Sequence, residues 1–204
     1  MAAFTIRPVR PADLASMSAL YSSFVSSSTC TWAYPEEPLP DFPALWAAAT
    51  ARGLPWLLAE GDGGEGGSAM PPALAGYAYV GPFRARAGWR FVCEHSLYVA
   101  PAWQRRGVGR ALLRALLAAS AAAPVATLVG VVSLHEGTGG GAASLALHRA
   151  EGFEVAGRLP RAGVKAGLAL DCVFVSRGVR DVEVVEREDR ERRAAAAAAS
   201  AVAQ

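Results

Sequence analysis

The stretch from Glu94 to Ser120 constrains this chain most, because it joins a strand pattern, a basic loop and a helix pattern in that order. Residues 96–100 alternate and are rich in strand-favouring side chains. Pro101 and the run Q-R-R-G-V-G-R interrupt this alternation, and four leucines then recur at helical spacing. A helix that begins after such a loop offers unpaired backbone N–H groups and a partial positive charge. The sequence therefore predicts a phosphate or pyrophosphate site at this helix N-terminus.

The composition of the loop suits the same ligand. Gly107 and Gly109 let the backbone come close to a bound group, and Arg105, Arg106 and Arg110 add charges that pair with phosphate. The run has neither the G-K-[ST] of a Walker A loop nor the G-x-G-x-x-G of a dinucleotide fold.

The overall composition limits the classes of protein to which this chain can belong. The chain has 204 residues, is 52% hydrophobic and carries a formal net charge of +2, so we expect one well-buried domain that binds neither nucleic acid nor a membrane. Cys30, Cys93 and Cys172 are odd in number and far apart, which predicts free thiols in a reducing compartment and no metal site. The first strand begins almost at once, at Phe4, so we expect no signal peptide and a cytoplasmic protein.

The periodicity predicts an α/β domain around a mixed sheet, in the order β-α-α-β-β-β-α-β-α-β-β. We expect strands at 4–9, 55–60, 74–81, 96–100, 126–134, 153–159 and 168–176, and helices at 11–24, 41–51, 110–120 and 144–148. Residues 61–72 and 137–141 are predicted flexible loops, and 160–167 a connector between the last two strands. This domain spans 1–177, and 178–204 is a charged, alanine-rich tail expected to be a solvated or frayed helix without an apolar face.

Several motifs resemble one enzyme family. Q-R-R-G-V-G at 104–109 resembles the Q/R-x-x-G-x-G/A signature of the GNAT acyl-CoA N-acetyltransferases. E-H-S-L-Y-V before it, G-Y-A-Y-V-G-P-F-R-A-R at 76–86, L-H-R-A-E-G-F at 147–153 and the segment 157–171 are similar to the phosphinothricin acetyltransferase branch. The resemblance covers about residues 4–177. It implies a GNAT fold, with a central mixed, mostly antiparallel twisted sheet flanked by helices, and a possible homodimer.

The resemblance also implies a site for acetyl-CoA and a general base. Glu94 matches the family's catalytic base, which must take a proton from an ammonium acceptor before the amine attacks the thioester. The implied cofactor contacts are Leu97, Tyr98, Val99, Arg105, Arg106, Gly107, Val108, Gly109, Arg110, Glu136 and Ser144. A backbone N–H of the strand at 97–99 can stabilise the thioester oxyanion.

On the acceptor side, the residues implied are Trp32, Arg84, Arg86 and His148. Several of these residues also have a simpler structural interpretation. Glu94 can be a solvated strand-end carboxylate, Arg84 and Arg86 a solvated hairpin end, His148 a structural histidine and Ser144 a helix cap. His95 alternates to the face opposite Glu94, so we expect it to be structural or exposed.

Three positions depart from the family pattern. Glu136 stands where the family has an asparagine, which removes a donor and adds charge near an anionic cofactor, although His135 can supply a donor instead. Val164 and Ala169 stand where an aromatic residue and a tryptophan are common, so the acceptor pocket is altered.

The expected activity is direct transfer of acetyl from acetyl-CoA to the amine of a small amino acid-like acceptor, such as phosphinothricin, methionine sulfoximine or methionine sulfone. The alternatives are another amine, such as a polyamine or a protein N-terminus, or a degenerate acyl-CoA-binding module with little turnover. Glu136 keeps this last alternative open.

Overall fold

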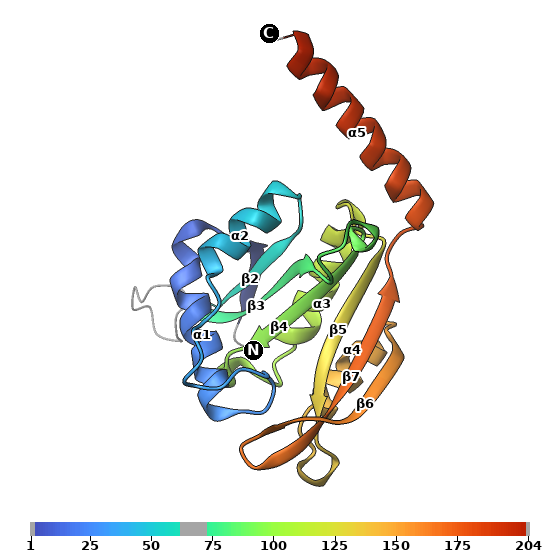
Figure 1. Cartoon of the computed structure of the whole chain (residues 1–204). Coiled ribbons are helices and arrows are strands. Elements are labelled where there is room, and N and C mark those ends of the chain that lie inside the picture. The colour runs from blue at the N-terminus through green and yellow to red at the C-terminus, as the bar shows by residue number, and fades with distance from the viewer. Residues whose placement is uncertain (1–2, 62–72, 203–204) are drawn as a thin grey trace.

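A computed structural model of the chain describes residues 3–61 and 73–202 (Figure 1). The strands are β1 (Phe4–Pro8), β2 (Trp56–Gly61), β3 (Ala73–Pro82), β4 (Val92–Val99), β5 (Thr127–Leu134), β6 (Glu154–Lys165) and β7 (Leu168–Gly178). The helices are α1 (Leu14–Ser27), α2 (Phe42–Ala51), α3 (Val108–Ala121), α4 (Ala142–Ala150) and α5 (Val182–Val202). The element order predicted from the sequence is confirmed. The loop predicted at 61–72 lies, apart from Gly61, outside the described residues.

The described strands form one twisted seven-stranded sheet in the order β1-β2-β3-β4-β5-β7-β6 (Figure 1). β4 and β5 run parallel, and the other neighbouring pairs run antiparallel. Parallel neighbours cannot be joined by a tight hairpin, so α3 provides the crossover between β4 and β5. The predicted mixed, mostly antiparallel sheet is confirmed.

Helices cover both faces of the sheet, α1 and α2 on one face and α3 and α4 on the other (Figure 1). Side chains of β3 alternate between the two layers. The Tyr77 ring contacts Phe42 of α2 with centroids 6.2 Å apart, whereas neighbouring Gly76 faces Leu112 of α3. Both faces of the sheet therefore pack against helices through fully buried hydrophobic side chains.

Local signals explain both ends of α2. Asp41 caps α2 by accepting a hydrogen bond from the Ala44 N–H at 2.9 Å, and Gly53, with a φ of +67°, ends it. Several element boundaries differ from the prediction, and two of these differences affect the site or the sheet. β4 begins at Val92 and not at residue 96, so Glu94 lies inside the strand, and β6 continues through the expected connector to Lys165 by way of a register shift.

Two segments predicted to be loose have regular structure. Residues 136–138 form a 3₁₀ turn closed by a bridge between His135 and Gly140, which corrects the flexible insertion predicted at 137–141. The tail forms α5, and Val185 in its first turns is fully buried against Phe91 and Ala126. The prediction of a tail without an apolar face is therefore wrong at its start, although the helix is exposed from residue 190 to 200.

Among the described residues, no helix is both long and apolar enough to cross a membrane.

Candidate active site

The site is organised by the point at which β4 and β5 separate. These strands pair in register from Val92 opposite Thr127 to His95 opposite Gly130, and the pairing ends there. Beyond it, β4 continues along β3 to Val99, and β5 continues along β7. Residues 96–99 therefore present a strand edge without a β5 partner, and this edge contains the predicted cofactor contacts Leu97, Tyr98 and Val99. Unpaired N–H and C=O groups on such an edge can bind an amide-containing arm.

The basic loop follows directly from this edge and opens α3. The first intrahelical bond of α3 runs from the Ala111 N–H to the Gly107 carbonyl at 3.0 Å, so the N–H groups of Val108, Gly109 and Arg110 have no intrahelical partner. Gly107 is the N-cap and has a φ of +86°, a conformation that glycine adopts without strain. The backbone of this loop (residues 104–110, called the phosphate loop below) thus has the geometry that the predicted phosphate site requires.

Side chains hold the loop in place. Gln104 donates from Nε2 to the Val99 carbonyl at 3.2 Å, which ties the loop to the end of β4. Trp103 is buried against Gly61, where an added Cβ would lie 2.1 Å from the indole ring. The exposed Arg106 guanidinium lies 5.5 Å from the centre of the same indole, and the side chain of Arg105 is also exposed. Both charges are free to meet a phosphate.

Arg110 and Gly109 have packing contacts in addition. Arg110 Nε lies 3.2 Å from Glu151 Oε1, and Arg114 Nε binds the other carboxylate oxygen at 2.8 Å. Glu151 follows α4, so these pairs join α3 to α4, and Arg110 is not a free loop cation. A Cβ at Gly109 would lie 3.4 Å from the Val99 side chain, which places this glycine where α3 packs on β4.

Glu94 lies at the point of separation, on the face covered by α1 and α2. Burial raises the pKa of its carboxyl, and the positive charge of Arg84 opposes that rise. Gly81 lies directly opposite on β3, and a Cβ added there would meet no atom within 4 Å. Glu94 is thus a half-buried carboxylate beside open space and within electrostatic range of an arginine. This environment suits a general base.

His95 lies at the same level on the opposite face, as the alternation predicted, but it is buried and not exposed. Its Nε2 lies 2.9 Å from His148 Nε2, and His148 Nδ1 lies 2.7 Å from the Ser144 carbonyl. Since a carbonyl only accepts, His148 carries its proton on Nδ1, and His95 donates from Nε2. Burial and the neighbouring imidazole lower the pKa of His95 to about 3, and burial lowers the pKa of His148. The pair is uncharged and links β4 to α4.

This arrangement changes two sequence predictions. His148 lies behind the sheet with His95 and not beside Glu94, so the structure does not bring it together with Arg84 as an acceptor contact. Ser144 is the third residue of α4, whose N-cap is Gly141 with a φ of +81°, so the capping role predicted for Ser144 is wrong.

The predicted acceptor contact Trp32 lies where the α1–α2 connection meets the β6–β7 hairpin. Lys165 is buried, and its Nζ donates to the carbonyl and the hydroxyl oxygen of Thr31 at 2.9 and 2.7 Å. Trp32 packs on Gly163, where an added Cβ would lie 2.8 Å from the indole. Tyr34 donates its hydroxyl to the Val164 carbonyl. Sequence reasoning found Trp32 but missed Lys165 and Thr31, because these residues are 134 positions apart.

The environment of Glu136 differs from the one inferred from the sequence. Its Oε1 accepts from Arg158 Nη2 at 2.7 Å, and Arg158 also pairs with Asp171, so one guanidinium offsets part of the charge of two carboxylates. His135 does not offer a spare donor from Nδ1, because this atom accepts from the Thr138 N–H at 3.1 Å. Arg86 precedes a 3₁₀ turn in the β3–β4 connection and has no ion-pair partner among the described residues.

Cys30, Cys93 and Cys172 are free thiols. Within residues 3–61 and 73–202, no three His, Cys, Asp or Glu side chains gather as a metal site would require.

This geometry agrees with comparisons to known proteins. Residues 56–155 match the family described as an acetyltransferase (GNAT) domain. The chain is 39% identical over 178 residues to the phosphinothricin N-acetyltransferase of Alcaligenes faecalis, covering 86% of this chain and 82% of that protein. The chain belongs to the GNAT acetyltransferase family.

Further relatives lie in the same branch of the GNAT family. The L-methionine sulfoximine/L-methionine sulfone acetyltransferase of Pseudomonas paraeruginosa is 33% identical over 171 residues, which cover 84% of this chain and 92% of that protein. The structure of a GNAT superfamily phosphinothricin acetyltransferase from Sinorhizobium meliloti in complex with acetyl-CoA superposes with a TM-score of 0.70. It is 32% identical, and the match covers 87% of this chain and 89% of that one.

The GNAT site described above fits acetyl-CoA. The free N–H groups at the start of α3, with Arg105 and Arg106, suit its pyrophosphate, and the unpaired edge of β4 suits its amide-bearing arm. This chain is therefore an acetyl-CoA-dependent acyltransferase.

Proposed function

We propose that this enzyme transfers the acetyl group of acetyl-CoA to the amine of a small amino acid-like acceptor, with Glu94 as the general base. The observation that carries the proposal is the position of Glu94, a half-buried carboxylate at the point where β4 and β5 separate, with open space opposite it at Gly81. An arm bound along residues 97–99 brings its thioester to this point. An amine that enters from the α1–α2 face then meets Glu94 and the thioester together.

The proton balance assigns Glu94 its role. The acceptor arrives as an ammonium ion, and Glu94 takes one proton so that the nitrogen lone pair can attack the thioester carbon. The C–N bond forms, and the C–S bond breaks. The amide nitrogen loses a second proton, the departing thiolate gains one, and one proton is released overall. The raised pKa of Glu94 brings it closer to that of the proton it must accept, which improves a general base as long as the carboxyl is ionised.

The acceptor class follows from charge. Arg84 acts on the Glu94 carboxylate and has no carboxylate partner among the described residues, so it can pair with a carboxylate or phosphinate of the acceptor. Arg86 belongs to the same connection and can assist. A polyamine would place a second cation near Arg84, so this feature favours a zwitterionic acceptor. Related proteins named as phosphinothricin and methionine sulfoximine/sulfone acetyltransferases support phosphinothricin, methionine sulfoximine and methionine sulfone as test acceptors.

The remaining alternatives lose support. Acceptors with a bulkier body, including a protein N-terminus, are favoured only by the small side chains at Val164 and Ala169; the Val164 side chain is 57% exposed. A degenerate acyl-CoA-binding module was suggested by Glu136, and the ion pair with Arg158, which Glu136 shares with Asp171, offsets part of the charge on which that suggestion rested.

We also propose that the enzyme is a cytoplasmic homodimer. The free thiols suit a reducing compartment. The exposed apolar residues Val155, Leu159 and Val164 lie on β6, an edge strand suited to pairing with a second copy.

Thiol release from acetyl-CoA tests the function directly, with the three named acceptors and a polyamine as substrates. We expect turnover with the amino acid-like acceptors. In wild type we expect activity to be lost as pH falls through the raised pKa of Glu94. Glu94→Gln should lower kcat by about 10²-fold or more and abolish that pH dependence. Glu154→Gln, which neutralises an exposed carboxylate on β6, is the matched control. Acetyl-CoA binding without turnover on any amine would refute the enzymatic function, and an unchanged pH profile in Glu94→Gln would refute the base.

A further inference from the structure

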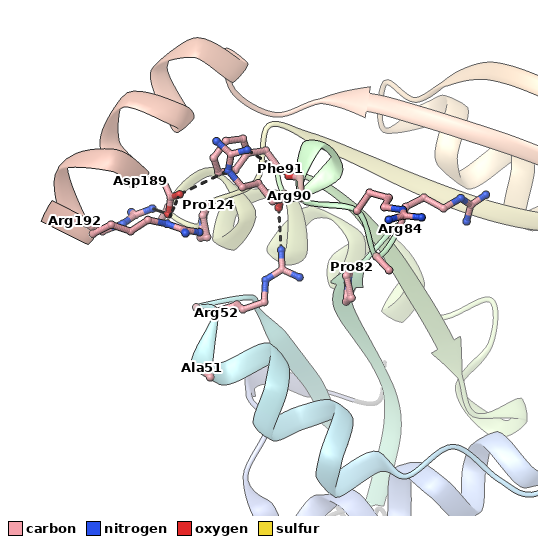
Figure 2. A pocket seen from close by; sticks show the side chains of 15 residues that line it. Ala51, Arg52, Pro82, Arg84, Arg90, Phe91, Pro124, Asp189 and Arg192 are labelled. Atoms are coloured by element: carbon pink, nitrogen blue, oxygen red, sulfur yellow. Dashed lines mark hydrogen bonds and ion pairs between the residues drawn. The ribbon is translucent and has the colours of Figure 1, made fainter. Parts of the chain in front are cut away.

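A second concave site lies at the end of the sheet opposite the phosphate loop (Figure 2). It is a cavity open to solvent on one side with a volume of about 780 Å³, within the ~300–1,000 Å³ range of small-molecule sites. Four separate segments line it: the end of α2, the β3–β4 connection, the α3–β5 connection and α5. The start of α3 forms the phosphate loop and its end reaches this cavity, so the two sites are roughly 20 Å apart, at ~1.5 Å per helical residue.

The lining of this cavity is strongly basic. Its arginines are Arg52, Arg84, Arg86, Arg90, Arg192 and Arg193, and the one carboxylate among the lining residues is Asp189. Figure 2 shows arginines on several sides of the cavity, with Arg192 beside Asp189 and Arg52 reaching towards Arg90. Like charges gathered in a concave site repel one another and attract anions.

Internal partners balance only part of this charge. Asp189 lies 2.9 Å from Arg193, 3.6 Å from Arg192 and 3.8 Å from Arg90. Arg52 donates to a neutral acceptor, the Arg90 carbonyl, at 2.9 Å. Within residues 3–61 and 73–202, no carboxylate is in ion-pair distance of Arg52 or of the two arginines at 84 and 86. The latter two are also the proposed acceptor contacts, so Arg52 and the arginines of α5 are the ones that distinguish this cavity from the acceptor side.

The helix ends at the cavity explain some of these arginines but not all. α2 and α3 both end here, and the partial negative charge of a helix C-terminus favours a nearby cation. Arg52 follows α2 directly and fits that role. The two helix C-termini together carry about one negative charge, which does not account for the arginines of the β3–β4 connection and of α5.

We propose that the cavity between α5 and the β3–β4 connection binds a small molecule that carries two or more negative charges, as phosphate esters and polycarboxylates do. Arginine is the side chain best suited to such groups, because its planar guanidinium forms paired hydrogen bonds with them. The apolar walls, which include Pro82, Phe91 and Pro124, leave room for the body of the molecule.

The same site gives α5 a function. This helix lies beyond residues 4–177, over which the sequence resembles the GNAT family. Val185 anchors its start, and Glu186 pairs with Arg90 at 3.3 Å, so Arg192 and Arg193 are held over the cavity. A bound anion bridges these side chains to Arg52 at the C-terminal end of α2. Anion binding and docking of α5 therefore reinforce each other.

Calorimetric titration of the full chain with pyrophosphate and with citrate, at constant ionic strength, tests the proposal. The protein is first saturated with CoA, which fills the phosphate loop. We expect binding of one or both anions in the micromolar to low millimolar range. Pyrophosphate alone points to a phosphate ester, citrate alone to a polycarboxylate, and each supports the site.

Two variants on different elements locate the binding. The double change Arg192→Gln/Arg193→Gln and the single change Arg52→Gln should each weaken binding about tenfold or more. Arg149→Gln/Arg187→Gln alters exposed arginines outside the cavity by the same net charge and should leave binding within about twofold. The proposal is overturned if neither anion binds the CoA-saturated protein, or if the control double variant loses as much affinity as the cavity variants.

Discussion

Replacing Gly130 by alanine tests how tightly the point of separation between β4 and β5 is built. A Cβ at Gly130 would lie 2.8 Å from His95 Cε1 and 3.0 Å from Val175 Cγ2. Contacting carbon atoms prefer ~3.5–4.0 Å, so the imidazole must move by about 1 Å. A movement of that size lengthens the 2.9 Å bond between His95 and His148 to the point at which it ceases to be a hydrogen bond.

The magnitude follows from three contributions. Overpacking a well-filled core costs about 1–3 kcal/mol, and leaving buried imidazole nitrogens without partners costs about 1–3 kcal/mol. Alanine restricts the unfolded chain and returns about 0.4–1 kcal/mol. We therefore expect Gly130→Ala to destabilise the protein by about 3 kcal/mol, which lowers Tm by roughly 6–12 °C in a chain of this size.

Denaturant unfolding and thermal melting measure this effect. Gly81→Ala is the matched control, since Gly81 lies on β3 at the same level, and a Cβ there meets no atom within 4 Å. We expect this control to stay within about 0.5 kcal/mol of wild type. A Gly130→Ala variant as stable as the control would show that His95 does not fill the space over Gly130.

Three further substitutions probe other contacts. Glu151→Gln should lower Tm at neutral pH and much less in acid. Arg114, with help from neighbouring arginines, lowers the pKa of Glu151, so the stabilisation from the ionised carboxylate is lost as pH falls through the lowered pKa. Melting at several pH values checks this, and a loss of Tm that does not depend on pH would contradict it. Lys165→Met keeps the aliphatic stem but removes both bonds to Thr31, so the acceptor KM should rise while the acetyl-CoA KM stays nearly constant in steady-state kinetics; an equal rise in both would contradict this. Val185→Asp buries a carboxylate and should detach α5, so trypsin should cleave at the arginines of α5 faster than in wild type, and an unchanged rate would show that Val185 does not anchor the helix.

The phosphate loop could be predicted because it depends on the local sequence alone. The strand, the glycine-bearing loop and the start of α3 lie within about twenty residues, and each follows from spacing and backbone preference alone. Strand alternation likewise placed Glu94 and His95 on opposite faces before any contact was known. Neither prediction required knowledge of which distant segments meet.

The contacts that the sequence did not reveal are those between distant residues. Lys165 and Thr31, Arg110 and Glu151, and Glu136 and Arg158 are pairs that only the assembled sheet brings together. The docking of α5 was missed for a related reason. One buried valine in a run of charges gives no periodic signal, and its partners lie at the starts of β4 and β5.

At the point where β4 and β5 separate, the two faces of the sheet have different functions. The reason lies in the neighbouring strands that hold β4 and β5. β4 stays with β3 and β5 stays with β7, so the strands part where their mutual pairing ends, at His95 and Gly130. Behind this point, an uncharged histidine pair fills the space and joins β4 to α4 without introducing a charge near the thioester. In front of it, Glu94 stays half-buried beside open space, where its carboxylate can still ionise. A strand that alternates between a packed face and an open face can thus support the separation and also supply the base, and an exchange of these two side chains would lose both functions.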